Sequence, residues 1–195
     1  MAITIAQAIK KILIREPFYG LFLIGLNKYF DNSIPTACVR KNGINVDLVI
    51  NKEYWDSLNE ETCINVLLHE LSHILFKHLW LWNDFPDREK FNIAADLHVN
   101  SYLNNVPNDW YHPKDFGFDI GNGTKWYYEN LPDNINFNQS NHSWDGFKDI
   151  SSSEKQLIEN QIDYRVKTVA EEILKTRGNI CILYIWQHPK YMKTS

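Results

Sequence analysis

One apolar segment constrains this chain more than any other, because it carries three groups that are costly to bury. Residues 66–80 read VLLHELSHILFKHLW, with His69, Glu70 and His73 among aliphatic residues at helical spacing. Moving an unpaired imidazole or carboxylate into apolar surroundings costs several kcal/mol unless a partner or a metal compensates. A core helix with this composition therefore predicts a functional site. The partners that compensate its buried polar groups must come from other parts of the chain.

The costly groups form an HExxH pattern. His69 and His73 are one helical turn apart, so both imidazoles can reach one point, and Glu70 is adjacent to that face. A catalytic zinc typically has three protein ligands plus a water, whose pKa the metal lowers, and a nearby carboxylate can take the proton. The pattern predicts zinc on His69 and His73, with Glu70 as general base. The alternative is a helix with two satisfied core histidines and a capping-type glutamate.

A third ligand is best supplied by FNIAADLHVNSYL, residues 91–103. Asp96 lies mid-helix among apolar residues, where a carboxylate needs a partner or a metal. Asn92 and Asn100 flank it at i−4 and i+4, so they could hold its carboxylate or a water as a second layer of support. We predict Asp96 as the third ligand; the alternative is a buried aspartate bonded only to a helix end or to Arg88.

Two further histidines compete for a place in this site. His78 completes HELSHILFKH, but a continuous helix places it about 140° around the axis from His73. The intervening ILFK contains no glycine to turn the chain, so we do not expect His78 to be a ligand. His142, in NHSWDGF, could enter the cleft as a transition-state donor or an extra ligand, and spacing does not decide between these roles.

The remaining patterns predict an α+β protein. Residues 36–50 read as a β-hairpin whose Asn42-Gly43 pair suits a tight turn. The loop-rich region 104–150 has little periodicity. Helical spacing predicts helices over about 4–14, 17–30, 57–82, 89–103 and 153–176, with a short helix near TKWYYENL, residues 124–131.

Length and charge exclude several classes of protein. The 195 residues suit one domain, and the net charge of −4 without a basic block does not indicate a nucleic-acid surface. Three distant cysteines suggest neither a zinc ribbon nor a disulfide framework. Charges interrupt the N-terminal apolar residues, so no signal peptide is indicated, and the longest uncharged run is too short to span a bilayer. We therefore expect a cytoplasmic protein that binds neither nucleic acid nor membrane.

The hairpin and the two helices together resemble a known family. TACVRKNGINVDLVINKEYWDSLNEETCINVLLHELSHILFKH, followed by FNIAADLHVNSYL, is similar to the putative metallopeptidase domain that often precedes a von Willebrand factor A-like domain in bacteria and phages. GTKWYYENLP and HSWDGF look like weaker motifs of the same family, and the resemblance covers roughly residues 20–180.

This resemblance implies a zincin-like fold, in which the HExxH helix and a second ligand helix pack on a small hairpin or sheet, with further N- and C-terminal helices. It implies His69, His73 and Asp96 as ligands of one catalytic zinc ion and Glu70 as general base, acting on a protein or peptide substrate. In zinc peptidases a strand edge such as that of the hairpin binds the substrate as an added strand. We expect a single domain over 1–195, although CILYIWQHPKYMKTS departs from the family and makes residues 180–195 an atypical tail.

A second function from another class is a catalytically inactive zincin-fold module that binds a protein partner. The chain has 7 Trp and 10 Tyr, and several of them lie in the 104–150 loops, where they would suit a protein-recognition surface. The alternative, which we favour, is that these aromatic side chains fill a core around irregular loops.

Overall fold

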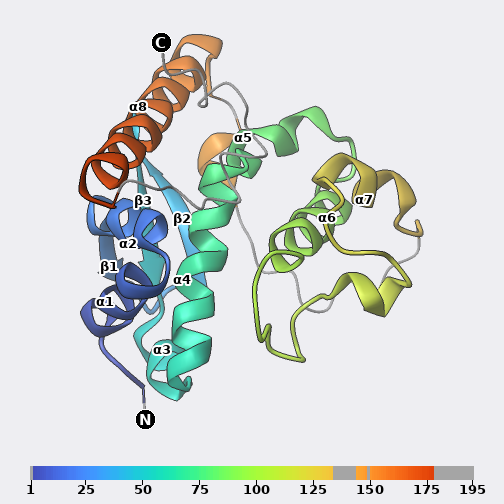
Figure 1. Ribbon diagram of the computed structural model, residues 1–195. Coiled ribbons are helices and arrows are strands. Elements are labelled where there is room, and N and C mark those ends of the chain that lie inside the picture. The colour runs from blue at the N-terminus through green and yellow to red at the C-terminus, as the bar shows by residue number, and fades with distance from the viewer. Residues whose placement is uncertain (1, 134–143, 149, 178–195) are drawn as a thin grey trace.

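A small sheet and one long central helix organise this chain, which we describe from a computed structural model at residues 2–133, 144–148 and 150–177 (Figure 1). The fold is α+β, as predicted. Its strands are β1 Asn27–Phe30, β2 Ala37–Asn42 and β3 Asn45–Ile50. Its helices are α1 Ile5–Arg15, α2 Pro17–Ile24, α3 Lys52–Ser57, α4 Glu60–Leu75, α5 His78–Leu81, α6 Arg88–Asn100, α7 Thr124–Asn130 and α8 Ser152–Arg177, with short 3-10 turns at Trp82–Asp84, Pro113–Phe116 and Asp145–Phe147.

The sheet has the strand order β1-β3-β2. β2 and β3 pair antiparallel, so the predicted hairpin is confirmed, and β1 pairs parallel with β3. At the hairpin turn Gly43 takes the positive φ of 60°, whereas Asn42 ends β2 in extended conformation. Within the described residues β2 therefore has β3 as its one strand neighbour and forms an edge of the sheet.

The predicted helix over 17–30 is wrong in its second half, because α2 ends at Ile24 and β1 follows. Lys28, in β1, donates hydrogen bonds from Nζ to the carbonyl oxygens of Leu23 and Leu26. These bonds satisfy acceptors at the end of α2, which a continuing helix would otherwise have used. Pairing of β1 with β3 satisfies the backbone of the strand, and only the tertiary structure provides that partner.

The predicted helix over 57–82 is also wrong as one element. Its main part, α4, begins after Asn59, whose Oδ1 accepts a hydrogen bond from the Thr62 N–H and so caps the helix. After α4 ends, Lys77 adopts a left-handed conformation with φ of 65°, and α5 begins at His78. Two acids of α8 lie near this turn: Lys77 Nζ is 3.4 Å from Asp163 and 3.9 Å from Glu159. Lys77 thus adopts the left-handed turn that usually requires glycine. Its side chain lies beside α8, about eighty residues further along the chain.

Two hydrophobic clusters form the core. The larger one joins α1, α2, the sheet, α4 and α8 and extends into α6 through Phe91 and Ala95, and the smaller one joins α6 and α7 around Ile93, Leu97 and Tyr127. Figure 1 shows α1, α2, the sheet and α8 on one side of α4, and α6 with α7 on the other. Tyr127 and Trp144 are both buried, which supports the view that aromatic side chains after residue 104 fill the core. The polar face of α4 is consequently directed toward α6.

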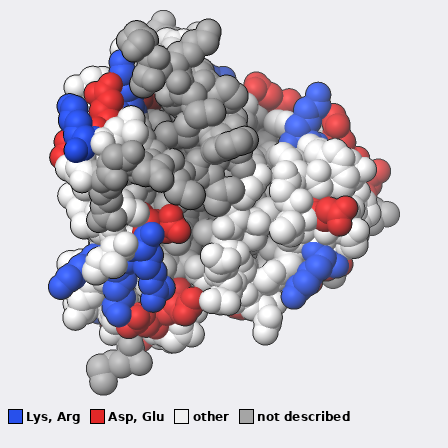
Figure 2. Space-filling model, in the orientation of Figure 1, with Lys and Arg blue, Asp and Glu red and all other residues white. Residues whose placement is uncertain are grey.

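The surface mixes charges of both signs. On the face shown in Figure 2, each group of basic side chains borders acidic ones. Among the helices described, none has both the length and the apolar character that crossing a bilayer requires. The expected atypical tail at 180–195 and His142 lie outside the described residues.

We predict that Gly20→Ala destabilises the packing of α1 against α2. A Cβ at Gly20 would lie 2.7 Å from Leu13 Cβ and closer still to its Cα, so one helix has to move. Overpacking of this kind costs about 1–3 kcal/mol. Gly123→Ala is the control, because a Cβ there meets nothing within 4 Å. Urea unfolding should show a lower midpoint for Gly20→Ala and little change for Gly123→Ala; equal midpoints for both variants would contradict the packing argument.

Candidate metal centre

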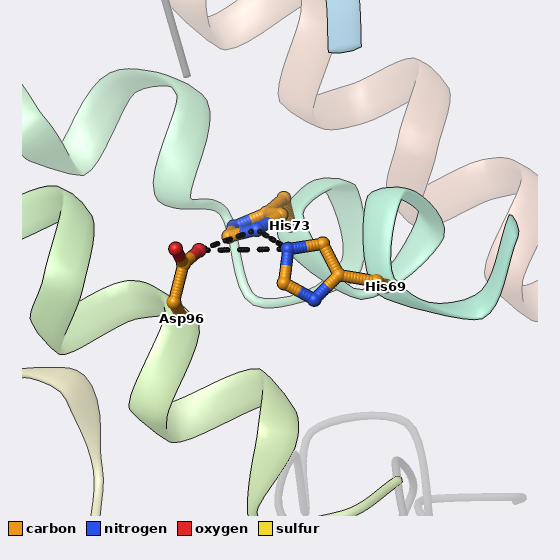
Figure 3. A group of neighbouring side chains, drawn as sticks. All are labelled: His69, His73 and Asp96. Carbon is orange, nitrogen blue, oxygen red and sulfur yellow. Dashed lines mark hydrogen bonds and ion pairs between the residues drawn. The ribbon is translucent and has the colours of Figure 1, made fainter. Parts of the chain in front are cut away.

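Three buried side chains from two helices meet between α4 and α6 (Figure 3). His69 and His73 project from consecutive turns of α4, and Asp96 projects toward them from the middle of α6. Their exposed fractions are 6%, 0% and 7%. The predicted convergence of these three residues is therefore present, although they come from segments more than twenty residues apart.

The separations of the donor atoms fit a tetrahedral metal ion. His69 Nε2 is 2.9 Å from His73 Nε2, and Asp96 Oδ1 lies 3.3 Å from His73 Nε2 and 3.5 Å from His69 Nε2. Ligand atoms bound at about 2.0–2.1 Å to a tetrahedral zinc ion lie about 3.3 Å from one another. Two imidazole nitrogens and a carboxylate oxygen are also a common donor set for a catalytic zinc. The residues present fit such an ion.

Asn100 orients His69. Its Nδ2 donates to the Tyr111 carbonyl at 2.8 Å, which turns its Oδ1 toward His69 Nδ1 at 3.0 Å. Because an amide oxygen only accepts, His69 carries its proton on Nδ1, and Nε2 keeps the lone pair that a metal requires. From the sequence we predict that Asn100 supports the Asp96 carboxylate or a metal-bound water. In the structure it bonds His69 instead, because the loop that follows α6 turns its amide.

A chain of hydrogen bonds orients His73 in the same way. His73 Nδ1 is 2.8 Å from His78 Nδ1, and His78 Nε2 is 2.8 Å from Thr124 Oγ1. Thr124 Oγ1 is also 2.8 Å from Nδ1 of the half-buried His98. One arrangement of protons satisfies every step with neutral rings: His73 donates to His78, His78 to Thr124, and Thr124 to His98. In that arrangement His73 also presents an unprotonated Nε2 toward Asp96.

His78 is buried completely and belongs to this supporting chain. Burial, followed by the neighbouring His73 and His98, holds the pKa of His78 well below its usual range, so the ring is neutral and its Nδ1 can accept the hydrogen bond from His73. Its two ring nitrogens lie beside His73 and Thr124, outside the group of donor atoms that His69, His73 and Asp96 form. The predicted position about 140° around a continuous helix is wrong, because the turn at Lys77 brings His78 back against the far nitrogen of His73.

Glu70 lines a cavity of about 100 Å³ together with His69 and Asp96, and is itself 3% exposed. Tyr54 reaches the same cavity from α3, and burial, then the charge of Glu70, raises the pKa of Tyr54 to about 12. Its hydroxyl is therefore protonated at neutral pH and can donate a hydrogen bond. Burial and Glu70 likewise raise the pKa of Cys38, in β2, to about 11. The remaining residues that line the cavity are Thr36, Ala37, Val66, Asn100, Asp109, Trp110 and Tyr111.

Several of these residues were not identified from the sequence. Tyr54 lies in a helix that the spacing did not predict, and Trp110, whose ring centre is 4.9 Å from that of His69, lies in an irregular loop. Thr124 had a weak signal, since it belongs to GTKWYYENLP. An α-helical pattern signals which residues share one face, whereas these contacts come from loops and short elements without periodicity.

Comparison with known proteins adds one finding. A family model described as putative metallopeptidase domain matches residues 3–148, a range that contains α1 to α7 and all the residues of the metal centre. No curated protein and no solved structure matches the chain significantly.

We predict that His78 supports metal binding through His73. His78→Leu removes the acceptor for His73 Nδ1, and loss of such a supporting group typically weakens metal affinity about 10–100-fold. His78→Asn keeps an acceptor near the position of Nδ1 and should retain most of the affinity. Competition against a zinc chelator measures both, with thermal unfolding as a check that each variant is folded. Equal affinities for the two folded variants would show that this hydrogen bond does not tune the site.

Proposed function

We propose that this chain, which belongs to the putative metallopeptidase domain family, is a zincin-type peptidase that hydrolyses peptide bonds with one zinc ion. The observation that carries the proposal is the geometry of the three donor atoms, at separations of 2.9–3.5 Å, beside the glutamate of the HExxH pattern. His69 and His73 through Nε2, and Asp96 through Oδ1, would hold the ion. When bound, zinc acts as a Lewis acid that lowers the pKa of water and polarises a carbonyl group.

Glu70 is the group in the cavity suited to move protons. It accepts a proton from the attacking water and later delivers it to the amine of the leaving peptide. Tyr54 can donate its O–H to the oxygen of the substrate carbonyl as negative charge develops there. Two neutral imidazoles and one carboxylate would leave a bound zinc ion with a net positive charge, which would favour the same negative charge.

The edge of the sheet is suited to hold the substrate. Ala37, the first residue of β2, and the preceding Thr36 line the cavity that contains Glu70. Since β2 is an edge strand among the described residues, a peptide can pair with it through backbone hydrogen bonds. Recognition through the backbone would place the peptide bond beside the metal with little dependence on sequence, and the side-chain preference would then come from the cavity walls, among them Trp110 and Tyr111.

The metal assignment predicts one zinc ion per chain, lost on Asp96→Asn. This substitution keeps the volume of the side chain but removes its charge, so zinc affinity should fall by about 100-fold or more, as for loss of a charged ligand, while the chain stays folded. Asp109→Asn is the control, because Asp109 is an exposed acid at the rim of the same cavity. Elemental analysis and chelator competition give the result. Unchanged zinc binding in Asp96→Asn with a lowered melting temperature would make Asp96 a structural acid instead.

The assignment of Glu70 predicts that Glu70→Gln separates metal binding from hydrolysis. Cleavage of a broad peptide library, followed by mass spectrometry, should fall by a factor of about 10²–10⁴, while zinc content is unchanged. Glu89→Gln, the same change at an exposed position of α6 outside the cavity, should retain its rate. If the zinc-loaded wild type and Glu70→Gln both leave the library intact, and both bind one protein without shortening it, the chain is instead a non-catalytic zincin-fold module.

A further inference from the structure

A second cavity lies away from the metal centre, between α2, α8 and the hairpin end of the sheet. Its volume is about 700 Å³, within the range of about 300–1,000 Å³ for small-molecule sites. None of the metal-centre residues lines it. Its walls combine apolar side chains with amides, one carboxylate and one guanidinium: they include Leu21, Phe22, Leu26, Ile158 and Ile162, then Asn27, Asn42, Asn45 and Gln161, and finally Asp47 and Arg165.

Arg165 is the unusual member of this wall. It is half-buried on α8, and its Cζ lies 5.6 Å from the ring centre of Phe22 in α2. Within the part of the chain that the structure describes, no residue accepts a hydrogen bond from this guanidinium or forms an ion pair with it. Burial lowers its pKa, yet an arginine stays charged at any physiological pH. Arg165 is therefore a permanent cation with five N–H donors at the cavity wall, and among the described residues its guanidinium contacts the Phe22 ring without a hydrogen-bond acceptor.

The position of this guanidinium is built into the fold. A Cβ at Gly25 would lie 2.8 Å from Arg165 Cζ and 2.9 Å from its Nη1. Gly25 has an ordinary φ of −83°, so its backbone conformation does not require glycine. The absence of a Cβ at Gly25 leaves the space that the guanidinium occupies at the end of α2, so a larger side chain there would displace the guanidinium.

A second cation adds to the positive potential. Burial, and after it the charge of Arg165, lowers the pKa of Lys28. Lys28 donates two of its three ammonium hydrogens to the carbonyls of Leu23 and Leu26 and is not among the described residues that line the cavity, so it contributes charge rather than a direct contact. The acids on the same stretch of α8, Glu159 and Asp163, lie beside Lys77, and Asp47 in the cavity wall accepts a hydrogen bond from Asn42 at 2.8 Å.

We infer that this cavity binds a small organic carboxylate with an apolar body. The planar fork of Arg165 matches a carboxylate through two parallel hydrogen bonds, and the aliphatic walls suit the body of the ligand. One guanidinium, with no second cation among the described residues that line the cavity, suits a monoanion better than a phosphate dianion. The inference does not depend on peptidase activity, because it uses no residue of the metal centre.

The test uses 4-phenylbutyrate as a probe of the full-length, zinc-loaded protein. Isothermal titration measures affinity, and the backbone amide signals of Phe22 and Gly25 in NMR spectra report where the probe binds. We expect these signals to shift, and the neutral 4-phenylbutyramide and inorganic phosphate to bind at least about tenfold more weakly, as loss of one charge-assisted interaction implies. Repeating the titration in Asp96→Asn separates this cavity from any carboxylate bound at the metal.

Variants decide whether Arg165 carries the binding. Arg165→Gln should weaken binding by about tenfold or more, and Gly25→Ala should also weaken it by displacing the guanidinium. Arg88→Gln is the matched control, because Arg88 also lies over an aromatic ring, that of Trp82, at 4.4 Å; it should leave affinity unchanged. Arg165→Lys, which keeps the charge without the fork, replaces Arg165→Gln if the latter does not fold, and should also bind more weakly. Unshifted Phe22 and Gly25 signals at millimolar probe, undiminished affinity in the Arg165 variant, or phosphate binding as tight as the carboxylate would each overturn the inference.

Discussion

The contact between α4 and α6 at His69, His73 and Asp96 is the constraint on which the rest of this structure depends. Two imidazole nitrogens and a carboxylate oxygen within 3.5 Å of one another are buried almost completely. Such a cluster is stable only if each ring is held in one orientation and one tautomer, because a rotated ring would bury a polar atom without a partner. Much of the chain outside the two helices serves that requirement.

Each histidine is held from a different direction. Asn100 fixes His69 from α6, and its own amide is turned by the loop at Tyr111. His73 is fixed through His78 and Thr124, which ties α4 to α5 and α7. The turn at Lys77 makes the second support possible, since a helix continuing through residue 77 would carry His78 away from His73. A left-handed lysine beside two acids of α8 thus couples the C-terminal helix to the metal centre.

The structural elements around α4 have two roles: some anchor its apolar side, and others position Asp96. The larger hydrophobic cluster, with the sheet, α1, α2 and α8, anchors the apolar side of α4 and presents β2 as an edge beside the metal cavity. The smaller cluster around α6 and α7 sets the position of Asp96 relative to α4. The cavity at Arg165 lies within the larger half, between α2 and α8. A ligand there would contact α2 and α8 without contacting His69, His73 or Asp96.

The sequence by itself determined the elements whose pattern repeats over several turns. The spacing of His69 and His73, the costly Asp96 in an apolar helix, the N-cap at Asn59 and the hairpin around Gly43 are local properties, because helical and strand periodicity places neighbouring side chains on one face. What the sequence left undecided depended on partners distant along the chain. β1 became a strand because β3 was available to pair with it, and Lys77 turned the chain beside the acids of α8. Asn100 bonded His69 instead of Asp96 because a loop carbonyl rotated its amide, and Tyr54, Trp110 and Thr124 reached the site from segments without periodicity. Local spacing establishes which groups share a face, whereas only tertiary packing establishes which group each of them meets.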